Sequence, residues 1–125
     1  MTDAPTKSRK ARSIAAQRSR SSRTSERSSL RAVSHPEADE ELEAAALWYE
    51  ARQPGLGDAF LDEFERTLRR IAAEPKRWRK IPGDNRKLNF HRFPYAIVYS
   101  LRADAIYVRA VMHVRRRPFY WKGRV

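Results

Sequence analysis

The sequence predicts an α+β domain in which an antiparallel helical hairpin packs on one face of a three- to four-stranded antiparallel sheet. Two observations support this prediction. Two stretches in the middle of the chain have apolar residues at helical spacing and are joined by a short Pro- and Gly-containing turn. The last third holds alternating apolar runs separated by short turns, which are typical of antiparallel strands. The hairpin leaves an apolar face that a sheet can cover.

Residues 1–28 are expected to form a disordered basic tail, and residues 29–125 a single folded domain. The tail is rich in Ser and Arg and almost free of large apolar residues, so burial cannot offset the entropy cost of ordering it. Three interpretations stay open: a nucleic-acid-binding tail, a transit-type leader, or an extension upstream of the true start. The tail lacks the apolar stretch of a secretory signal, so export is not expected.

The first helix is expected to begin near Pro36, because an early proline followed by carboxylates suits a helix start and its dipole. Its apolar stripe is formed by Ala38, Leu42, Ala45, Ala46 and Tyr49. Residues 53–57 then break the pattern. Asp58 is a plausible N-cap for the second helix, which should end near Ala73, before Pro75. The buried stripe of this second helix is formed by Phe60, Phe64, Leu68 and Ile71.

The strands are expected in the remaining segments. Residues 30–33 could form a first short strand, and residues 75–83 read as a linker with Trp78 and Ile81 as anchors into the core. Further strands are expected at residues 86–91, 95–100 and 106–113, with turns at residues 92–94 and near Asp104.

The charge is strongly basic and unevenly distributed. The 125-residue chain carries a formal net charge of +12, yet residues 37–65 hold ten acidic residues against one arginine, and residues 66–125 hold seventeen Lys and Arg against three acids. This balance favours anionic partners. The chain has no cysteine and only three histidines, so neither a metal nor a cofactor is expected. No apolar run is long enough to span a membrane, and a cytoplasmic location is expected.

The C-terminal third combines arginines with aromatic rings, as phosphate and base recognition requires. The candidate residues for binding a target or a partner are Arg86, Arg92, Arg115, Arg116, Arg117 and Trp121. The alternative is that these arginines only solvate a surface. His113 is a candidate general acid or base, although a lone histidine at a strand end is more often structural. Tyr120 could donate a proton or stack, whereas the alternative for Trp121 is that it anchors the segment.

Several segments resemble the RelE/ParE family of toxins. The helical part of the resemblance consists of Glu41 to Tyr49, Pro54 to Gly57 with Phe60, and Ile71 to Pro75. The part in the sheet and C-terminal segment consists of Arg92 to Tyr95, Ile97, Tyr99, His113, Arg116, Pro118, Tyr120 and Trp121. The resemblance spans about Leu30 to Arg124. It implies the toxin of a type II toxin–antitoxin pair, of the kind described as plasmid stabilisation systems, bound and neutralised by a small cognate antitoxin in a hetero-oligomer.

The resemblance implies two alternative mechanisms. The RelE-like branch cleaves mRNA on the ribosome without metal, and the matching candidates here are His113, Arg116 and Tyr120, with Arg115 as the alternative arginine. That branch places a phosphate-contacting arginine where this chain has Ala96, which weakens the nuclease interpretation. The ParE-like branch inhibits DNA gyrase without chemistry of its own. We expect the ParE-like function, with the endonuclease, or an inactive member that only binds its antitoxin, as the alternatives.

Overall fold

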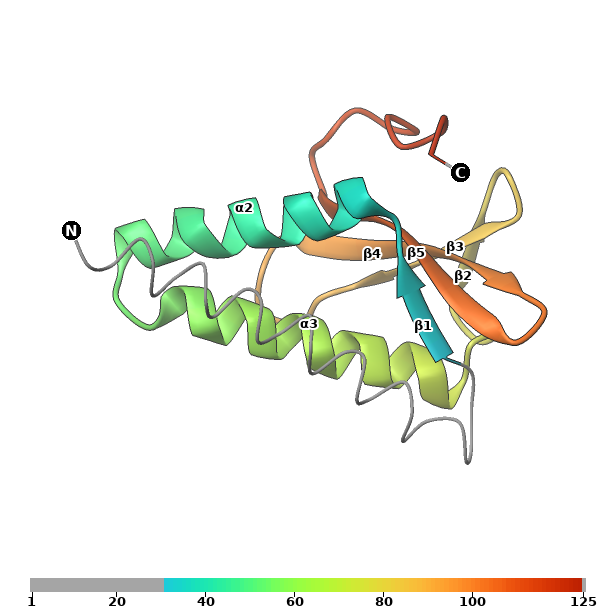
Figure 1. The fold of residues 1–125 in the computed structure, drawn as a ribbon, viewed down its shortest axis with the longest axis horizontal. Helices are drawn as coiled ribbons and strands as arrows, with labels where there is room; N and C mark the ends of the chain where they lie inside the picture. The colour runs from blue at the N-terminus through green and yellow to red at the C-terminus, as the bar shows by residue number, and fades with distance from the viewer. Residues whose placement is uncertain (1–30, 125) are drawn as a thin grey trace.

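The computed structural model describes residues 31–124, so the tail predicted at residues 1–28 lies outside the described residues. A short strand, two helices and four further strands follow one another along the chain (Figure 1). Their bounds are β1 (Arg31–Ser34), α2 (Pro36–Arg52), α3 (Leu56–Ala73), β2 (Arg79–Ile81), β3 (Asn85–Asn89), β4 (Tyr95–Arg102) and β5 (Ala105–His113).

The five strands form one sheet in the order β1-β5-β4-β3-β2. The predicted α+β class is confirmed, but the sheet has five strands instead of three or four, and it is mixed. Pairs β2–β3, β3–β4 and β4–β5 are antiparallel, whereas β1 runs parallel to β5. The parallel pair is possible because the whole hairpin and three strands separate β1 from β5 in sequence. The extra strand β2 lies in the segment that the sequence indicates as a linker. It has only three residues, so it is too short to show an alternation of apolar and polar side chains.

The two helices lie side by side, joined by a tight turn (Figure 1). Helix α2 begins as predicted at Pro36, and the His35 side chain caps it by accepting a hydrogen bond from the Glu37 N–H at 3.0 Å. Helix α3 begins at Leu56, two residues before the predicted cap. The carboxylate of Glu50, on α2, instead accepts hydrogen bonds from the N–H groups of Gly55 and Gly57. The cap comes from the preceding helix, so a local pattern could not show it.

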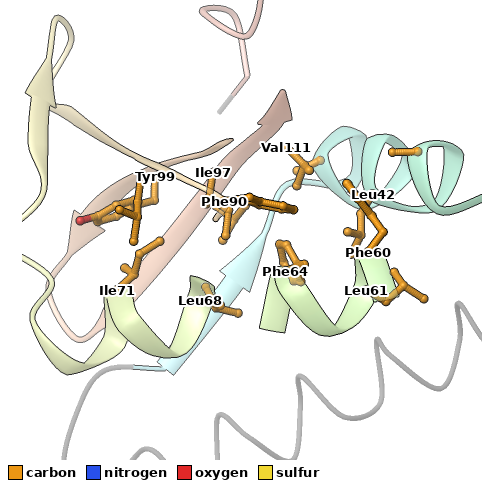
Figure 2. Close-up of a cluster of buried hydrophobic side chains, with 14 of the residues drawn as sticks. Leu42, Phe60, Leu61, Phe64, Leu68, Ile71, Phe90, Ile97, Tyr99 and Val111 are labelled. Carbon is orange, nitrogen blue, oxygen red and sulfur yellow. The ribbon is translucent and has the colours of Figure 1, made fainter. Parts of the chain in front are cut away.

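The main core lies between the helices and one face of the sheet (Figure 2). Its fully or almost fully buried side chains include Leu42, Phe60, Leu61, Phe64, Leu68, Ile71, Phe90, Ile97, Tyr99 and Val111. The half-buried Trp78 packs against this core, as predicted. Between the helices, Gly57 allows close contact, because a Cβ atom there would lie 2.6 Å from the backbone oxygen of Ala46. The two helices therefore approach closely because position 57 has no side chain, and apolar packing stabilises the hairpin.

A second, smaller cluster lies on the opposite face of the sheet, which we call the outer face. It consists of Ala96, Val98, Ala110, Met112 and Trp121, with Ile81 and Tyr120 packed against it. Ile81 is therefore an anchor as predicted, although on this second cluster. Trp121 comes from the C-terminal segment, residues 114–124, which returns above the first turns of α2 (Figure 1). Strand β4 is consequently buried on both faces.

Candidate partner-binding site

A pocket of about 410 Å³ opens between α2 and the ends of β4 and β5. Its lining residues are Glu41, Ala44, Ala45, Trp48, Tyr49, Tyr95, Val111, His113 and Arg116. Three of the lining residues are aromatic (Trp48, Tyr49 and Tyr95), and a histidine and an arginine also line the pocket. Trp48 is 52% exposed, and its neighbour Leu47, which lies outside the pocket lining, is 37% exposed. The pocket thus combines an apolar floor with a few polar groups, as binding sites do.

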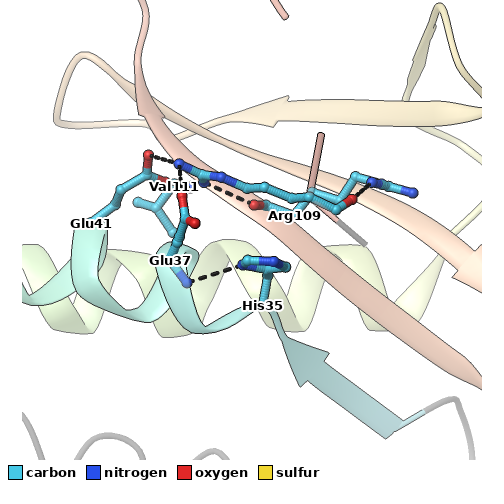
Figure 3. Close-up of polar contacts among 6 residues, drawn as sticks. His35, Glu37, Glu41, Arg109 and Val111 are labelled. Carbon is cyan, nitrogen blue, oxygen red and sulfur yellow. Dashed lines mark hydrogen bonds and ion pairs between the residues drawn. The ribbon is translucent and has the colours of Figure 1, made fainter. Parts of the chain in front are cut away.

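The C-terminal segment is fastened beside this pocket by Arg124. Its guanidinium donates two hydrogen bonds to the carboxylate of Glu41, each at 2.9 Å, and a third to the backbone oxygen of Arg109 at 3.1 Å. Glu37 lies 3.2 Å away as a second ion-pair partner. Arg109 donates in turn to the backbone oxygen of Arg124. We call these contacts of Arg124 with Glu41 and Arg109 the clasp. The clasp joins the C-terminal segment to both α2 and β5 (Figure 3).

Glu41 is the centre of the clasp, because its Oε1 also accepts a hydrogen bond from the Val111 N–H at 3.0 Å. The carboxylate therefore joins α2, β5 and the C-terminal segment. The side chains of Glu41 and Arg124 are 17% and 10% exposed. Hydrogen bonding to Glu41 raises the pKa of Arg124 above its ordinary value, although burial acts in the opposite direction. Arg124 is therefore charged at neutral pH.

His113 ends β5 at the rim of the pocket. Its Nδ1 accepts a hydrogen bond from the Arg115 N–H at 3.0 Å, so the neutral ring carries its proton on Nε2. The ring packs edge-on against Tyr95, with 5.2 Å between the centroids. His113 therefore has the structural role of ordering the turn after β5, while it also lines the pocket.

Tyr120 lies behind the pocket rim and not within it. The guanidinium of Arg116 stacks over its ring at 3.9 Å. The Tyr120 hydroxyl is buried and makes no hydrogen bond of ordinary geometry within the described residues. Burial raises the pKa of Tyr120, and the nearby carboxylate of Glu41 raises it further. The predicted catalytic trio is thus only partly assembled: His113 and Arg116 share the pocket, whereas Tyr120 contacts Arg116 from behind.

The predicted binding residues divide into two groups. Arg92, Arg115, Arg116 and Arg117 are exposed. Arg92 lies in the β3–β4 turn, and this turn meets the C-terminal segment where the Val114 N–H donates to the backbone oxygen of Pro94 at 2.9 Å. These four arginines therefore surround one end of the sheet. We call them the basic rim.

Two other candidates are placed in packing roles. Arg86 donates hydrogen bonds to the backbone oxygens of Lys76 and Trp78, both at 2.9 Å, and so orders the segment before β2. Trp121 is only 4% exposed and fills the second cluster, so its ring is an anchor and is not available at the surface for binding. The physical reason is that the outer face of β4 and β5 is apolar and needs a cover, which the C-terminal segment supplies.

Sequence reasoning did not identify Glu41, Trp48 or Arg124 as site residues. Glu41 was one acid in a run of acids, and its partner is 83 residues away. No group of three or more His, Cys, Asp or Glu side chains within residues 31–124 is arranged to hold a metal ion. None of the helices in this range is long and apolar enough to cross a membrane.

Comparisons with known proteins agree with the fold. The family model described as the ParE toxin of the type II toxin–antitoxin system parDE matches residues 33–118. Among solved structures, the chromosomal ParDE toxin–antitoxin system from P. aeruginosa matches with a TM-score of 0.58 at 13% identity. This match covers 66% of the present chain and 92% of the other, and at that identity it shows the fold alone. A search of curated protein sequences gives no match. Because the family model covers more than half of the chain, the chain belongs to the ParE toxin family of type II toxin–antitoxin systems.

Proposed function

We propose that this protein is a toxin that inhibits DNA gyrase in the cytoplasm and that a cognate antitoxin neutralises it. The family match is the observation that carries this proposal. The inhibitory surface is the basic rim, formed by Arg92, Arg115, Arg116 and Arg117, which presents exposed cations from two adjacent segments. A surface of this kind can bind an acidic protein patch or DNA held by an enzyme without making or breaking a covalent bond.

The antitoxin is expected to bind in the pocket beside α2. Exposed Trp48 in the pocket offers an apolar anchor, as does its exposed neighbour Leu47 outside the lining. His113 and Arg116 in the pocket offer donors to a carboxylate. An amphipathic segment that places its apolar residues on Trp48 would therefore also cover Arg116. Because Arg116 belongs to the basic rim, occupation of the pocket would mask part of the target-binding surface. The solved structure with a similar fold is that of a toxin–antitoxin system.

A second candidate function is ribosome-dependent mRNA cleavage. The observation that favours it is that His113 and Arg116 line the same pocket, so a base and a phosphate-binding cation lie together. Two features oppose it. Ala96 is fully buried and supplies no cation, and the raised pKa of Tyr120 leaves its buried hydroxyl a poor proton donor.

Two assays on the full chain, purified after co-expression with its antitoxin and released from it, test these candidates. The proposal expects loss of gyrase supercoiling with intact mRNA in a ribosome-programmed reaction. Ribosome-dependent cleavage that His113→Ala abolishes would support the second candidate instead. A folded protein that binds its antitoxin but fails in both assays would show an inactive family member. The control variant is Arg66→Ala with Arg69→Ala, which removes two exposed arginines of α3 that are not part of the basic rim.

A further inference from the structure

The acidic and basic residues of the described chain separate by layer. All ten acidic residues between positions 37 and 65 lie in α2 or α3, whereas none of the five strands contains an Asp or a Glu. The strands do contain lysines and arginines. The sheet side of the domain is therefore basic, and the helical side is acidic.

The strand register places four of these cations on the outer face. Lys87 pairs with Val98, a member of the outer cluster, and Arg79 pairs with Lys87. Arg102 follows Val98 by four residues along β4 and so points to the same face. Arg31 lies on the same face, because Arg31 and Arg102 both pair with Ala105 of β5. None of the four makes an ion pair with a described acidic side chain.

These four cations form two rows across the sheet. Arg79 and Lys87 lie level with Val98, and Arg102 and Arg31 lie level with one another nearer the β4–β5 turn. Four residues of extended chain separate the rows along β4, a distance of about 13 Å. The major groove of duplex DNA is about 12 Å wide. The two rows are therefore spaced to meet the phosphates on the two sides of one groove.

The surface between the rows presents no flat ring for stacking with unpaired bases. Tyr107 lies there, paired with Ser100, but the guanidinium of Arg102 covers its ring at 3.9 Å. The residue is only 8% exposed. Single-stranded nucleic acid is usually held by base stacking on exposed aromatic rings. The strands of the outer face therefore lack this element, whereas the side chain of Arg102 is exposed and carries a cation.

We propose that the outer face of the sheet binds the phosphate backbone of duplex DNA through Arg31, Arg79, Lys87 and Arg102. The contact is independent of base sequence, because its donors reach phosphates and not base edges. The four residues of this site belong neither to the pocket nor to the basic rim. It goes beyond the proposed inhibition of gyrase and does not depend on it, because DNA binding is measured without gyrase.

The experiment compares two variants of the full chain in binding to a fluorescent 20-base-pair duplex over a range of salt concentrations. The test variant is Arg79→Gln with Arg102→Gln. The control variant is Arg66→Gln with Arg69→Gln, on α3; all four arginines are exposed, so both variants lose the same charge from the surface. The basic tail is unchanged in both variants, so its contribution cancels in the comparison. Circular dichroism and thermal unfolding establish that each variant is folded.

The proposal expects the test variant to bind the duplex about tenfold more weakly. The slope of log K against log salt concentration should fall in magnitude by about 1.8, because the variant loses two phosphate contacts that each contribute about 0.9. The control variant should keep the slope of the parent. Equal losses in both variants would show diffuse charge attraction and overturn the proposal. Unchanged binding in both would assign all binding to the tail or basic rim, and overturn it as well. Tighter binding to a single-stranded RNA with the same number of phosphates would contradict the choice of duplex DNA.

Discussion

Arg124 and Glu41 form a two-pronged ion pair that joins the end of the described chain to the second turn of α2, with two hydrogen bonds of 2.9 Å. The pair holds the C-terminal segment over the outer face and beside the pocket. Two consequences follow. The segment that contains Trp121 and Tyr120 is held in place by a contact with α2. The same contact holds the segment that carries three of the four arginines of the basic rim.

Replacement of Glu41 by Gln should lower the free energy of unfolding by about 3 kcal/mol, because it leaves Arg124 without its main partner in a largely buried position. Urea unfolding followed by circular dichroism measures this change. The matched control is Glu40→Gln, the neighbouring exposed residue of α2, which should alter stability by less than about 0.5 kcal/mol. Equal effects of the two substitutions would show that the clasp contributes nothing specific.

Substitution of Tyr120 by Phe should leave both stability and growth inhibition nearly unchanged. The buried hydroxyl faces the Glu41 carboxylate but makes no hydrogen bond of ordinary geometry within the described residues, so its removal costs little stability. Stability should change by less than about 1 kcal/mol. Growth after induction, compared between the parent and the variant at equal protein levels, measures the function. Loss of inhibition by a variant that is folded and equally stable would indicate that the hydroxyl takes part in a reaction.

Tyr99 makes the stability of the domain sensitive to high pH. Its hydroxyl donates a 2.7 Å hydrogen bond to the backbone oxygen of Pro75, and burial raises its pKa to about 12. An unfolded chain loses this proton near pH 10. Stability from this group is therefore complete below pH 10 and is lost as the pH rises from 10 to 12.

The measurement is the free energy of unfolding between pH 9 and 12. For the parent protein it should fall by about 1–3 kcal/mol from this group. Tyr99→Phe should be less stable at pH 9, since it loses the hydrogen bond, and should show a shallower fall. Because the pKa values of Tyr49, Tyr95 and Tyr120 are also raised, part of the fall should remain. Identical slopes for parent and variant would contradict the role assigned to Tyr99.

Local patterns in the sequence were sufficient for the helical hairpin and the three central strands. The stripe of Phe60, Phe64, Leu68 and Ile71 has helical spacing and lies in the main core, as predicted. The features that could not be predicted depend on contacts between distant segments. Strand β1 pairs in parallel with β5, and Glu50 caps the helix that follows its own. Periodicity within one element carries no information about such contacts.

The candidate site divides in the same way. The exposed arginines of the basic rim were identified because a run of three arginines is visible in the sequence. For Trp121 the sequence indicates both a binding role and an anchoring role, and the choice between them depends on the apolar outer face of two distant strands. Glu41 could be identified only through Arg124 and Val111, which lie 83 and 70 residues away.

The central claim is that this toxin acts on gyrase through its basic rim. The most direct test is supercoiling of relaxed plasmid by purified gyrase with increasing amounts of the full chain, compared with the variant Arg92→Ala, Arg115→Ala and Arg117→Ala. The claim predicts inhibition by the parent chain, and inhibition weakened at least about tenfold in the folded variant, as for the loss of several charged contacts. Full supercoiling at a large molar excess of the folded parent chain would contradict it.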